Sequence, residues 1–283
     1  MEQIRIMDNK NYTLGLYEKA MPITLSWEEK MIACKEAGFD FIELSVDETD
    51  AKLSRIDWTN EERAEIVKLM FKHDVHFGSI CLSGHRKYPL GSKELEVRAL
   101  EISEKTMKLA SDLGIRIVML AGYDVYYTES TDETKERFLK NLIKTSEFAA
   151  KYGVTLGFET METEFMNTVE KAMKYVDLVG SPYLNVYPDL GNITNAAVAM
   201  KKDVLDDIET GRGRLVAAHL KETVPGVFRE MEYGTGHVDF EAGINKFKEL
   251  GVKRYVGEFW HKGEENWRQI LKDNNNFLRK YLD

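Results

Sequence analysis

The amino-acid sequence predicts an α/β fold, a single (β/α)8 TIM barrel that covers residues 1–283 as one domain. Short apolar segments alternate with amphipathic segments along the whole chain, which indicates strands that are each followed by a helix. Glycine stands between several amphipathic segments and the next apolar one, where it ends a helix in a left-handed conformation. A doubly wound open sheet is the alternative, but no GxGxxG or Walker sequence follows a predicted strand.

Eight apolar segments are predicted to be strands. Their apolar character is nearly continuous, which is typical of parallel strands that are buried on both faces. In chain order the segments are TLGLY (13–17), FDFIELSV (39–46), VHFGSICLS (75–83), IRIVMLAG (115–122), VTLGFET (154–160), YLNVYPD (183–189), LVAAHLKE (215–222) and RYVGEFW (254–260).

The segments between these strands have the 3.6-residue period of amphipathic helices. Thr59 and Glu62 have the spacing of a capping box and mark the start of one helix. Glycine precedes the next strand in the phrases AGFDF, LGIRI, YGVTL and LGVKR. The predicted helices cover residues 27–38, 59–74, 95–113, 133–152, 167–180, 239–250 and 264–282.

The composition is that of a globular enzyme, with 43% hydrophobic and 31% charged residues. The formal net charge is −9, and this sign opposes binding to nucleic acid, whose phosphate backbone requires a basic protein face. The N-terminal sequence MEQIRIMDNK lacks the apolar core of a signal peptide, and the chain has no long apolar segment that could span a membrane. We therefore expect a cytoplasmic protein, with Cys34 and Cys81 as buried free thiols.

Four polar residues stand at the ends of the last four predicted strands: Glu159, Asp189, His219 and Glu258. The active site of a (β/α)8 barrel lies where the carboxyl ends of the parallel strands meet, so these side chains can converge. Carboxylate and imidazole ligands without a thiolate suit a divalent ion such as Mn²⁺, Co²⁺, Zn²⁺ or Mg²⁺. The sequence therefore predicts a site for one divalent metal ion.

The two glutamates of this set, Glu159 and Glu258, fall on strands 5 and 8, which lie on roughly opposite sides of a central ligand. Two carboxylates that face each other across a substrate carbon can remove a proton on one face and return one on the other. A metal ion at the same place can polarise a carbonyl and stabilise the enediolate that forms. This arrangement predicts inversion of a stereocentre next to a carbonyl.

Further side chains are candidates for binding the substrate. His85 and Arg86 lie in the loop CLSGHRKYPLGS (81–92), which is either a solvated basic loop or a rim that meets an anionic group. Lys221 faces the same way as His219 by strand alternation. Glu43 either contacts the substrate or supports another site residue. The turn GTGH (234–237) either binds a phosphate through its N–H groups or is a plain turn.

The chain resembles the L-ribulose/L-xylulose 5-phosphate 3-epimerases of L-ascorbate and related sugar pathways, which belong to the xylose-isomerase-like (β/α)8 superfamily. The resemblance covers nearly the whole length, and the phrases that carry it are LGLYEKAMP, FDFIELSVDETDAKLSRIDW, CLSGHRKYPLGS, LAGYDVYY, YPDLGN, AHLKET and YVGEFW. It implies that Glu159, Asp189, His219 and Glu258 bind the metal and that the two glutamates are the acid–base pair. It also implies a ketose phosphate substrate, and a homodimer is plausible for the family.

Two positions depart from the related epimerases of free sugars. Asn192 stands where those enzymes usually have a substrate-binding histidine, and Phe165 stands where they often have a substrate-binding glutamate. These departures count against an unphosphorylated hexulose as the substrate. Asn192 is accordingly included among the expected substrate-binding residues.

The leading hypothesis is therefore the interconversion of L-xylulose 5-phosphate and L-ribulose 5-phosphate by exchange of the C3 proton. A related ketose- or hexulose-phosphate epimerase and an aldose–ketose isomerase on the same barrel are the enzymatic alternatives. A family-2-type endonuclease needs several zinc ions and a basic groove, whereas this chain has six histidines and a net negative charge. A sugar-binding protein without catalytic activity is the remaining alternative.

Overall fold

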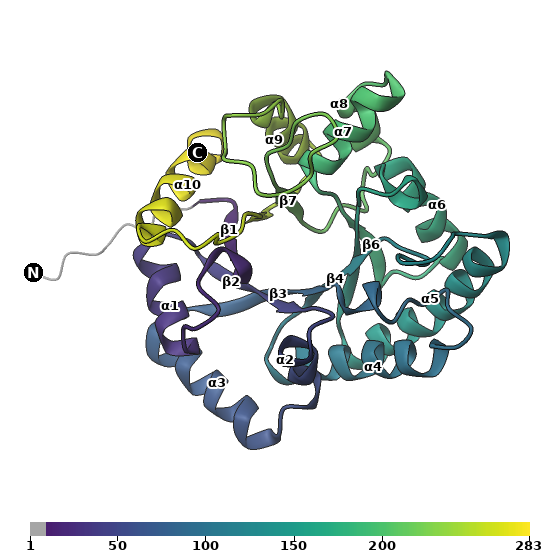
Figure 1. Cartoon of the computed structure of the whole chain (residues 1–283), viewed down its shortest axis with the longest axis horizontal. Helices are drawn as coiled ribbons and strands as arrows, with labels where there is room; N and C mark the ends of the chain where they lie inside the picture. Colours follow the sequence, from purple (N-terminus) through teal and green to yellow (C-terminus); the bar gives the residue numbers. More distant parts are fainter. Residues whose placement is uncertain (1–9) are drawn as a thin grey trace, which may run out of the picture.

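The computed structural model describes residues 10–283, and its central element is a sheet of eight parallel strands (Figure 1). The strands follow one another around the sheet in the order β6-β5-β4-β3-β2-β1-β8-β7. Isolated bridges between Val186 and Leu215 and between Asp189 and His219 join the two end strands, so the sheet closes into a barrel. The strands are β1 (Thr13–Tyr17), β2 (Phe41–Val46), β3 (His76–Leu82), β4 (Ile117–Ala121), β5 (Thr155–Glu159), β6 (Leu184–Tyr187), β7 (Ala218–Leu220) and β8 (Arg254–Gly257).

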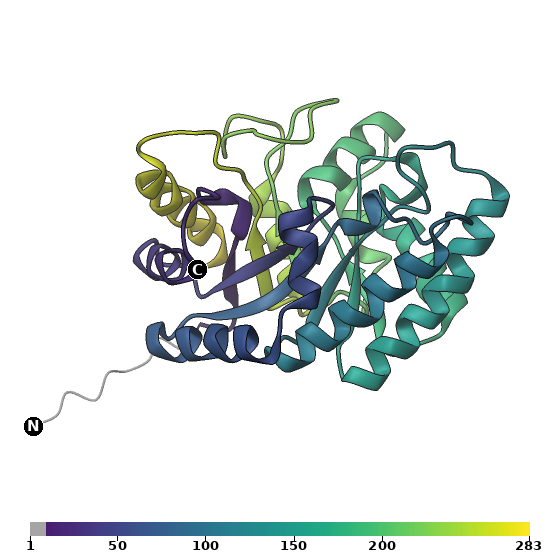
Figure 2. The same ribbon diagram turned by 60° about the horizontal axis from the view of Figure 1, so that its bottom comes forward.

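Helices surround the strands, as Figures 1 and 2 show, and the predicted (β/α)8 barrel is confirmed. The α-helices are α1 (Trp27–Glu36), α2 (Asp50–Leu53), α3 (Asn60–His73), α4 (Glu96–Asp112), α5 (Asp132–Tyr152), α6 (Val169–Val179), α7 (Leu190–Met200), α8 (Val204–Glu209), α9 (Phe240–Glu249) and α10 (Trp267–Leu282). Four short 3-10 turns lie at Glu18–Ala20, Ser54–Asp57, Gly84–Arg86 and Glu164–Met166. None of the helices in residues 10–283 has the length and apolar character needed to cross a lipid bilayer.

The capping box and the glycine stops that the sequence predicts lie at the ends of helices in the structure. Thr59 and Glu62 form the predicted capping box at the start of α3. Gly153 and Gly180 end α5 and α6 in the left-handed conformation, with φ of 66° and 63°. Residues 1–9 lie outside the described residues, so the expectation that the N-terminal sequence is not a signal peptide stays a prediction.

Helices α7 and α8 occupy the connection between β6 and β7, where the sequence analysis assigned no helical range. Helix α7 begins directly after Asp189, which caps it through a hydrogen bond from the backbone N–H of Asn192. Its first eight residues are all buried, so it lacks the polar face that marks an amphipathic helix in a sequence. This burial explains why the periodicity did not reveal the helix.

The barrel interior is filled by side chains, and its amino-terminal end is closed by Phe41. A Cβ atom at Gly15 or Gly78 would lie only 2.2 or 2.3 Å from the Phe41 ring, so both positions need glycine to make room for it. Above Phe41, a second layer contains Tyr17, Cys81, Met119, Tyr187 and Val256, all buried. Buried side chains thus fill the barrel interior below the carboxyl ends of the strands, where the active sites of such barrels lie.

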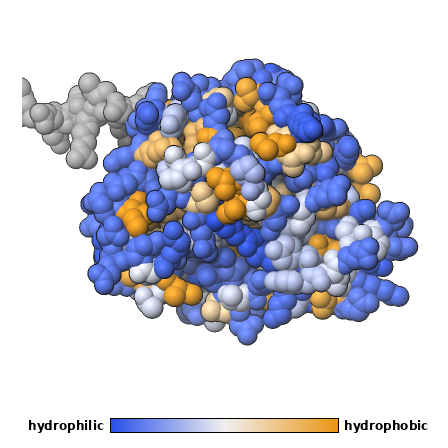
Figure 3. Space-filling view, turned by 45° about the horizontal axis from the view of Figure 1, so that its top comes forward, coloured by the Kyte–Doolittle hydropathy of each residue, from blue (hydrophilic) through white to orange (hydrophobic). Residues whose placement is uncertain are grey.

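A larger apolar core lies between the strands and the surrounding helices and includes Leu14, Ile80, Val118 and Leu156. The outer surface is mainly hydrophilic, with apolar residues scattered over it, as Figure 3 shows for one face. The strand-to-helix loops project from one end of the barrel (Figure 2), and the longest of these without a helix or strand joins β7 to α9.

Candidate metal centre and cavity

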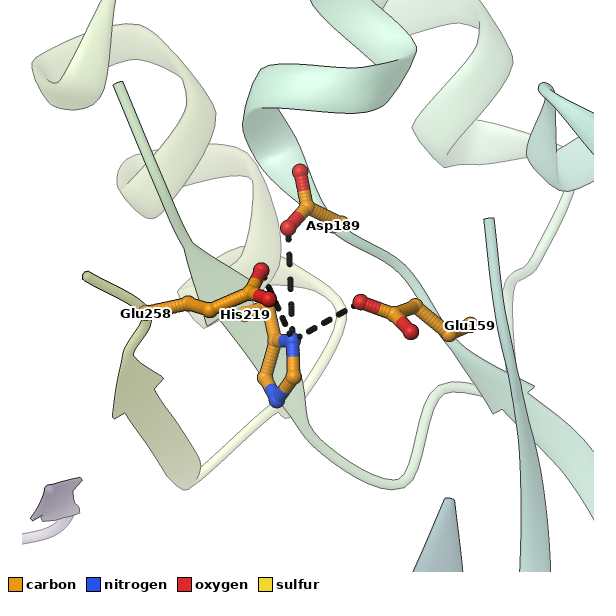
Figure 4. Close-up of side chains that lie close together, drawn as sticks. All are labelled: Glu159, Asp189, His219 and Glu258. Atoms are coloured by element: carbon orange, nitrogen blue, oxygen red, sulfur yellow. Dashed lines mark hydrogen bonds and ion pairs between the residues drawn. The ribbon is translucent and has the colours of Figure 1, made fainter. Parts of the chain in front are cut away.

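Four side chains from the second half of the barrel meet at its carboxyl end (Figure 4). Glu159 is the last residue of β5, Asp189 follows β6, His219 lies in β7, and Glu258 follows β8. All four are buried, and each offers one ligand atom within 4.8 Å of the ligand atoms of the others. The structure thus brings together the set of residues that the sequence predicts as a metal site.

The imidazole of His219 lies at the centre of this cluster. Its Nδ1 atom is 3.0 Å from Oε1 of Glu159, 3.3 Å from Oε2 of Glu258 and 3.9 Å from Oδ2 of Asp189. Its other nitrogen, Nε2, points away from the cluster and is 2.7 Å from Oε1 of Glu43. The rings of Tyr17 and Tyr187 lie beside the imidazole.

The donor atoms of the cluster fit a divalent cation. Oδ1 of Asp189 accepts the N-cap hydrogen bond from Asn192, which leaves Oδ2 directed at the cluster. Within residues 10–283, neither Oδ2 of Asp189 nor Oε2 of Glu258 has a donor with hydrogen-bonding geometry, although both are buried. Buried carboxylate oxygens without hydrogen bonds are costly unless a cation compensates them. Three carboxylates and one imidazole are ligands that Mn²⁺, Co²⁺, Zn²⁺ and Mg²⁺ accept.

Lys221 is a second cation at this place. Its Nζ atom is 3.1 Å from Oδ2 of Asp189 and 3.3 Å from Oε2 of Glu258, and its side chain is buried. The ammonium group therefore balances part of the negative charge of the three carboxylates. It also borders the cavity in front of Glu258.

The surroundings give the two glutamates different acidities. Burial, followed by the charge of Glu258, raises the pKa of Glu159. Burial also acts to raise the pKa of Glu258, but Lys221 and His219 outweigh it and hold that pKa well below its usual range. Burial lowers the pKa of His219, but the carboxylates of Glu43 and Glu258 outweigh this effect and raise it well above the ordinary value. The pair of glutamates is thus electrostatically asymmetric.

A small cavity opens in front of the cluster, and Glu159 and Glu258 form part of its wall. Three of the predicted substrate-binding residues, Arg86, Asn192 and Lys221, also line it. The amide of Asn192 donates to the carbonyl of Thr160 over 2.7 Å, whereas its Oδ1 atom is buried without a partner among the described residues. Asn192 therefore offers a free acceptor beside the cavity.

The two other predicted substrate-binding residues lie outside the cavity lining. Glu43 lies behind His219, fully buried in the barrel interior. His85 is buried against α4, where its Nε2 atom is 3.2 Å from both the carbonyl of Ala99 and the hydroxyl of Ser103. His85 thus anchors the loop that carries Arg86, and the Arg86 guanidinium lies 4.9 Å from the centre of the Tyr126 ring.

The backbone N–H groups around the turn at residues 234–237 are bound by a side chain of the protein, Glu222. The carboxylate of Glu222 accepts hydrogen bonds from the backbone N–H groups of Thr223, Gly234 and Val238, over 3.0, 2.9 and 3.2 Å. Of the two interpretations of this turn, the structure supports a plain turn, because Glu222 already fills the position that a phosphate would take.

Several residues that line the cavity are not among the predicted site residues. Lys19 follows β1 by two residues, so the rule that sites lie at the carboxyl ends of strands could have identified it. Glu162 and Arg229 come from long loops and form an ion pair of 3.0 Å at the cavity rim. Tyr123 donates a hydrogen bond to the same glutamate over 2.9 Å. The periodicity of helices and strands does not predict where loop residues lie, so these positions are known only from the folded chain.

Comparison with known proteins agrees with this architecture. A sequence model of the family described as xylose isomerase-like TIM barrel matches residues 31–281. L-ribulose-5-phosphate 3-epimerases named UlaE from Salmonella paratyphi A and from Escherichia coli are 43% identical to the chain over 263 residues, which cover 92% of this chain and 91% of each relative.

Solved structures with lower identity share the fold. A D-psicose 3-epimerase from Clostridium cellulolyticum H10 has a TM-score of 0.80 at 14% identity, covering 96% of this chain and 99% of that one. An L-ribulose 3-epimerase has a TM-score of 0.74 at 20% identity, with 96% and 94% covered. The IolI protein with a bound zinc atom has a TM-score of 0.74 at 18% identity, with 95% and 99% covered.

Proposed function

Because the chain belongs to the xylose isomerase-like TIM barrel family, and within it to the L-ribulose-5-phosphate 3-epimerases, we propose that it interconverts L-xylulose 5-phosphate and L-ribulose 5-phosphate. The single observation that carries this proposal is the cluster of Glu159, Asp189, His219 and Glu258, in which two buried glutamates border one cavity. The identity of 43% to the UlaE relatives over 92% of the chain supports the choice of substrate.

The four cluster residues are the ones that would hold the metal ion, with His219 binding through Nδ1. A bound divalent ion would polarise the C2 carbonyl of the ketose and so make the C3 proton more acidic. The solved IolI structure, which has the same fold, contains a bound zinc atom. The donor set leaves Mn²⁺, Co²⁺, Zn²⁺ and Mg²⁺ as candidates.

The protein side chains carry out the proton exchange. One glutamate removes the proton from C3, and the electron pair of the C3–H bond forms the C2–C3 double bond of an enediolate, with negative charge on O2. The other glutamate then delivers a proton to the opposite face of C3, which restores the ketone with inverted configuration. Glu159 and Glu258 exchange the roles of acid and base when the reaction runs in the other direction.

The remaining cavity residues orient the sugar phosphate. Lys221 lies beside Glu258 and would donate to a sugar oxygen, and Asn192 would accept from a hydroxyl group through its free Oδ1. Lys19, Arg86 and Arg229 line the outer part of the cavity, where Asp47 pairs with Lys19 and Glu162 pairs with Arg229, and these cations would bind the phosphate end of the substrate. Glu43 and His85 support this site from behind, through His219 and through the loop that carries Arg86.

Exchange of the C3 proton with solvent tests the proposal. We expect the metal-loaded enzyme to convert L-xylulose 5-phosphate in D₂O into L-ribulose 5-phosphate with deuterium at C3, as read by NMR. We expect Glu159→Gln and Glu258→Gln to lower kcat by at least about 100-fold, because each removes an acid–base group.

Glu104→Gln is the matched control, because Glu104 lies on α4, where Lys151 donates to it over 2.8 Å, and is part of neither the cluster nor the cavity lining. Solvent label at C1 or C2 would instead indicate an aldose–ketose isomerase. Binding of the sugar phosphate without any label in the product would leave only a sugar-binding protein.

A further inference from the structure

The structure assigns a role to Glu43 that the reaction itself does not require. We propose that Glu43 is a positioning residue, which fixes the imidazole of His219 so that Nδ1 is free to bind the metal. The proposal rests on the metal-dependent function proposed above. Glu43 lies in β2, which β1 and β8 separate from β7, and its side chain is fully buried.

The tautomer of His219 follows from the chemistry of its partner. A carboxylate accepts hydrogen bonds but cannot donate them, so Oε1 of Glu43, at 2.7 Å, requires the hydrogen of His219 to be on Nε2. A neutral imidazole with its hydrogen on Nε2 has its lone pair on Nδ1. Nδ1 is the atom that faces Glu159, Asp189 and Glu258. When a cation replaces the proton on Nδ1, the hydrogen bond to Glu43 keeps the remaining hydrogen on Nε2, so Glu43 favours the tautomer that can act as a ligand.

Glu43 is itself held in place by two hydroxyl groups. Ser79 donates to its Oε2 atom over 2.6 Å and Tyr187 donates to the same atom over 3.2 Å, which leaves Oε1 for His219. The partners come from β3, β6 and β7, so this carboxylate is fixed from three directions. A side chain with this many partners holds the imidazole in one orientation.

An irregularity in the sheet creates this arrangement. The pairing of β2 with β3 shifts by one residue after Ile42, so that Glu43 lies opposite Ser79 instead of Gly78. Because side chains alternate between the two faces of a strand, a regular register would place glycine beside Glu43 and remove the hydroxyl partner. Bulges of this kind are frequent next to active sites, where they redirect a side chain.

The energetics of burial argue that Glu43 serves function rather than stability. A buried carboxylate pays a large desolvation penalty, and a neutral side chain of the same shape is often as stable or more stable. Here four carboxylates, those of Glu43 and the three acidic cluster residues, surround only two cationic side chains, His219 and Lys221. Replacing Glu43 by glutamine removes one negative charge from this group while keeping its size.

The experiment compares Glu43→Gln and Glu43→Asp with wild type, and uses Ser79→Ala as a matched control that leaves the carboxylate in place. Binding of Co²⁺ to the metal-free protein, without substrate, is followed by visible absorption and by competition with a chromophoric chelator. Thermal unfolding of the metal-free protein is measured in parallel. At saturating metal, kcat and KM are then determined.

We expect Glu43→Gln to raise the Kd for Co²⁺ by about 10- to 100-fold, the usual effect of losing the hydrogen-bond partner of a metal-binding histidine. Its metal-free protein should melt at the wild-type temperature or above. At saturating metal kcat should fall while KM stays within about twofold of wild type, since Glu43 acts through the metal site and not on bound sugar. The affinity of Glu43→Asp for Co²⁺ should lie between those of Glu43→Gln and wild type. Ser79→Ala should lose less Co²⁺ affinity than Glu43→Gln does.

Other outcomes would overturn the proposal. Unchanged Co²⁺ affinity and absorption with a raised KM would make Glu43 a substrate contact. Unchanged affinity with a lower melting temperature of the metal-free protein would make it purely structural. Wild-type protein that binds no divalent ion would contradict the proposed function as well, and this result differs from a loss of affinity in the variants alone.

Discussion

At the scale of single residues, the site depends on surroundings that make identical side chains behave differently. Glu159 and Glu258 are the same residue type at the ends of two strands, and the sequence identified both. Burial and Glu258 raise the pKa of Glu159, whereas Lys221 and His219 outweigh burial and lower that of Glu258. The sequence could not show this difference, because the groups that cause it come together only in the folded barrel.

His85 provides a prediction at this scale, because it is a buried neutral histidine. Burial lowers its pKa to about 4, whereas the ordinary value is 6.5. Below pH 6.5 the unfolded chain therefore binds a proton that the folded chain does not, and folding stability falls as the pH decreases from 6.5 towards 4. The full effect is about 3 kcal/mol.

The check is urea unfolding of wild type and His85→Gln at pH 7.5 and pH 5. Between pH 7.5 and pH 5, we expect the free energy of unfolding of wild type to fall by about 2 kcal/mol more than that of the variant. The reason is that only wild type has a histidine whose protonation is prevented by folding. Equal losses in the two proteins would show that His85 does not contribute to acid sensitivity.

At the scale of elements, the sequence predicted the regular parts of the fold better than the loops. Capping residues and glycine stops located the ends of α3, α5 and α6, because these signals act within one turn of the chain. Helix α7 was missed because its residues are buried on nearly all sides. The loop between β7 and α9 carries Phe228 and Arg229 to the cavity, and no sequence period predicted that placement.

Glu222 holds the base of this loop and provides the prediction for this scale. Its carboxylate accepts three backbone hydrogen bonds, and a glutamine there would turn one acceptor into a donor that faces an N–H group. We expect Glu222→Gln to loosen the loop and raise KM for the sugar phosphate by about tenfold, equivalent to roughly 1.4 kcal/mol. Steady-state kinetics at saturating metal measure this effect.

Glu232→Gln is the control, since it makes the same change on the same loop at an exposed side chain outside the cavity lining. Co²⁺ affinity should be the same in Glu222→Gln as in wild type, because Glu222 is not among the four cluster residues. A KM equal to that of wild type would show that the loop does not depend on this carboxylate.

At the scale of the whole molecule, the barrel has a seam between β6 and β7, where strand pairing is interrupted, and the proposed metal site lies there. Strands β6 and β7 form no continuous ladder and are joined by isolated bridges and by a few hydrogen bonds, such as the 2.9 Å bond from the N–H of His219 to the carbonyl of Pro188. Glu159 and Asp189 lie on one side of this seam, and His219 and Glu258 lie on the other. A metal ion bound by all four residues would link the two sides of this seam and stabilise the closed barrel.

Removal of metal should therefore destabilise the barrel at this seam. We expect a chelator to lower the free energy of unfolding by about 2.7 kcal/mol relative to protein with free metal at roughly 100 times Kd. Hydrogen exchange should accelerate at the amides of Val186, Val216 and His219, and change little at the ladder between β2 and β3. If exchange accelerates equally over all strands, or does not accelerate at the seam, the metal does not stabilise this seam.

The sequence by itself predicted the barrel, the order of its strands and the four residues of the proposed metal site, because period, capping and strand ends are signals that act along the chain. Only the tertiary structure decided which side chains support those four. The contact between Glu43 and His219 joins residues 176 positions apart, and the pair of Glu162 with Arg229 joins two loops. Such contacts depend on the curvature and register of the closed sheet, including the shift beside Ile42, and no local pattern encodes them.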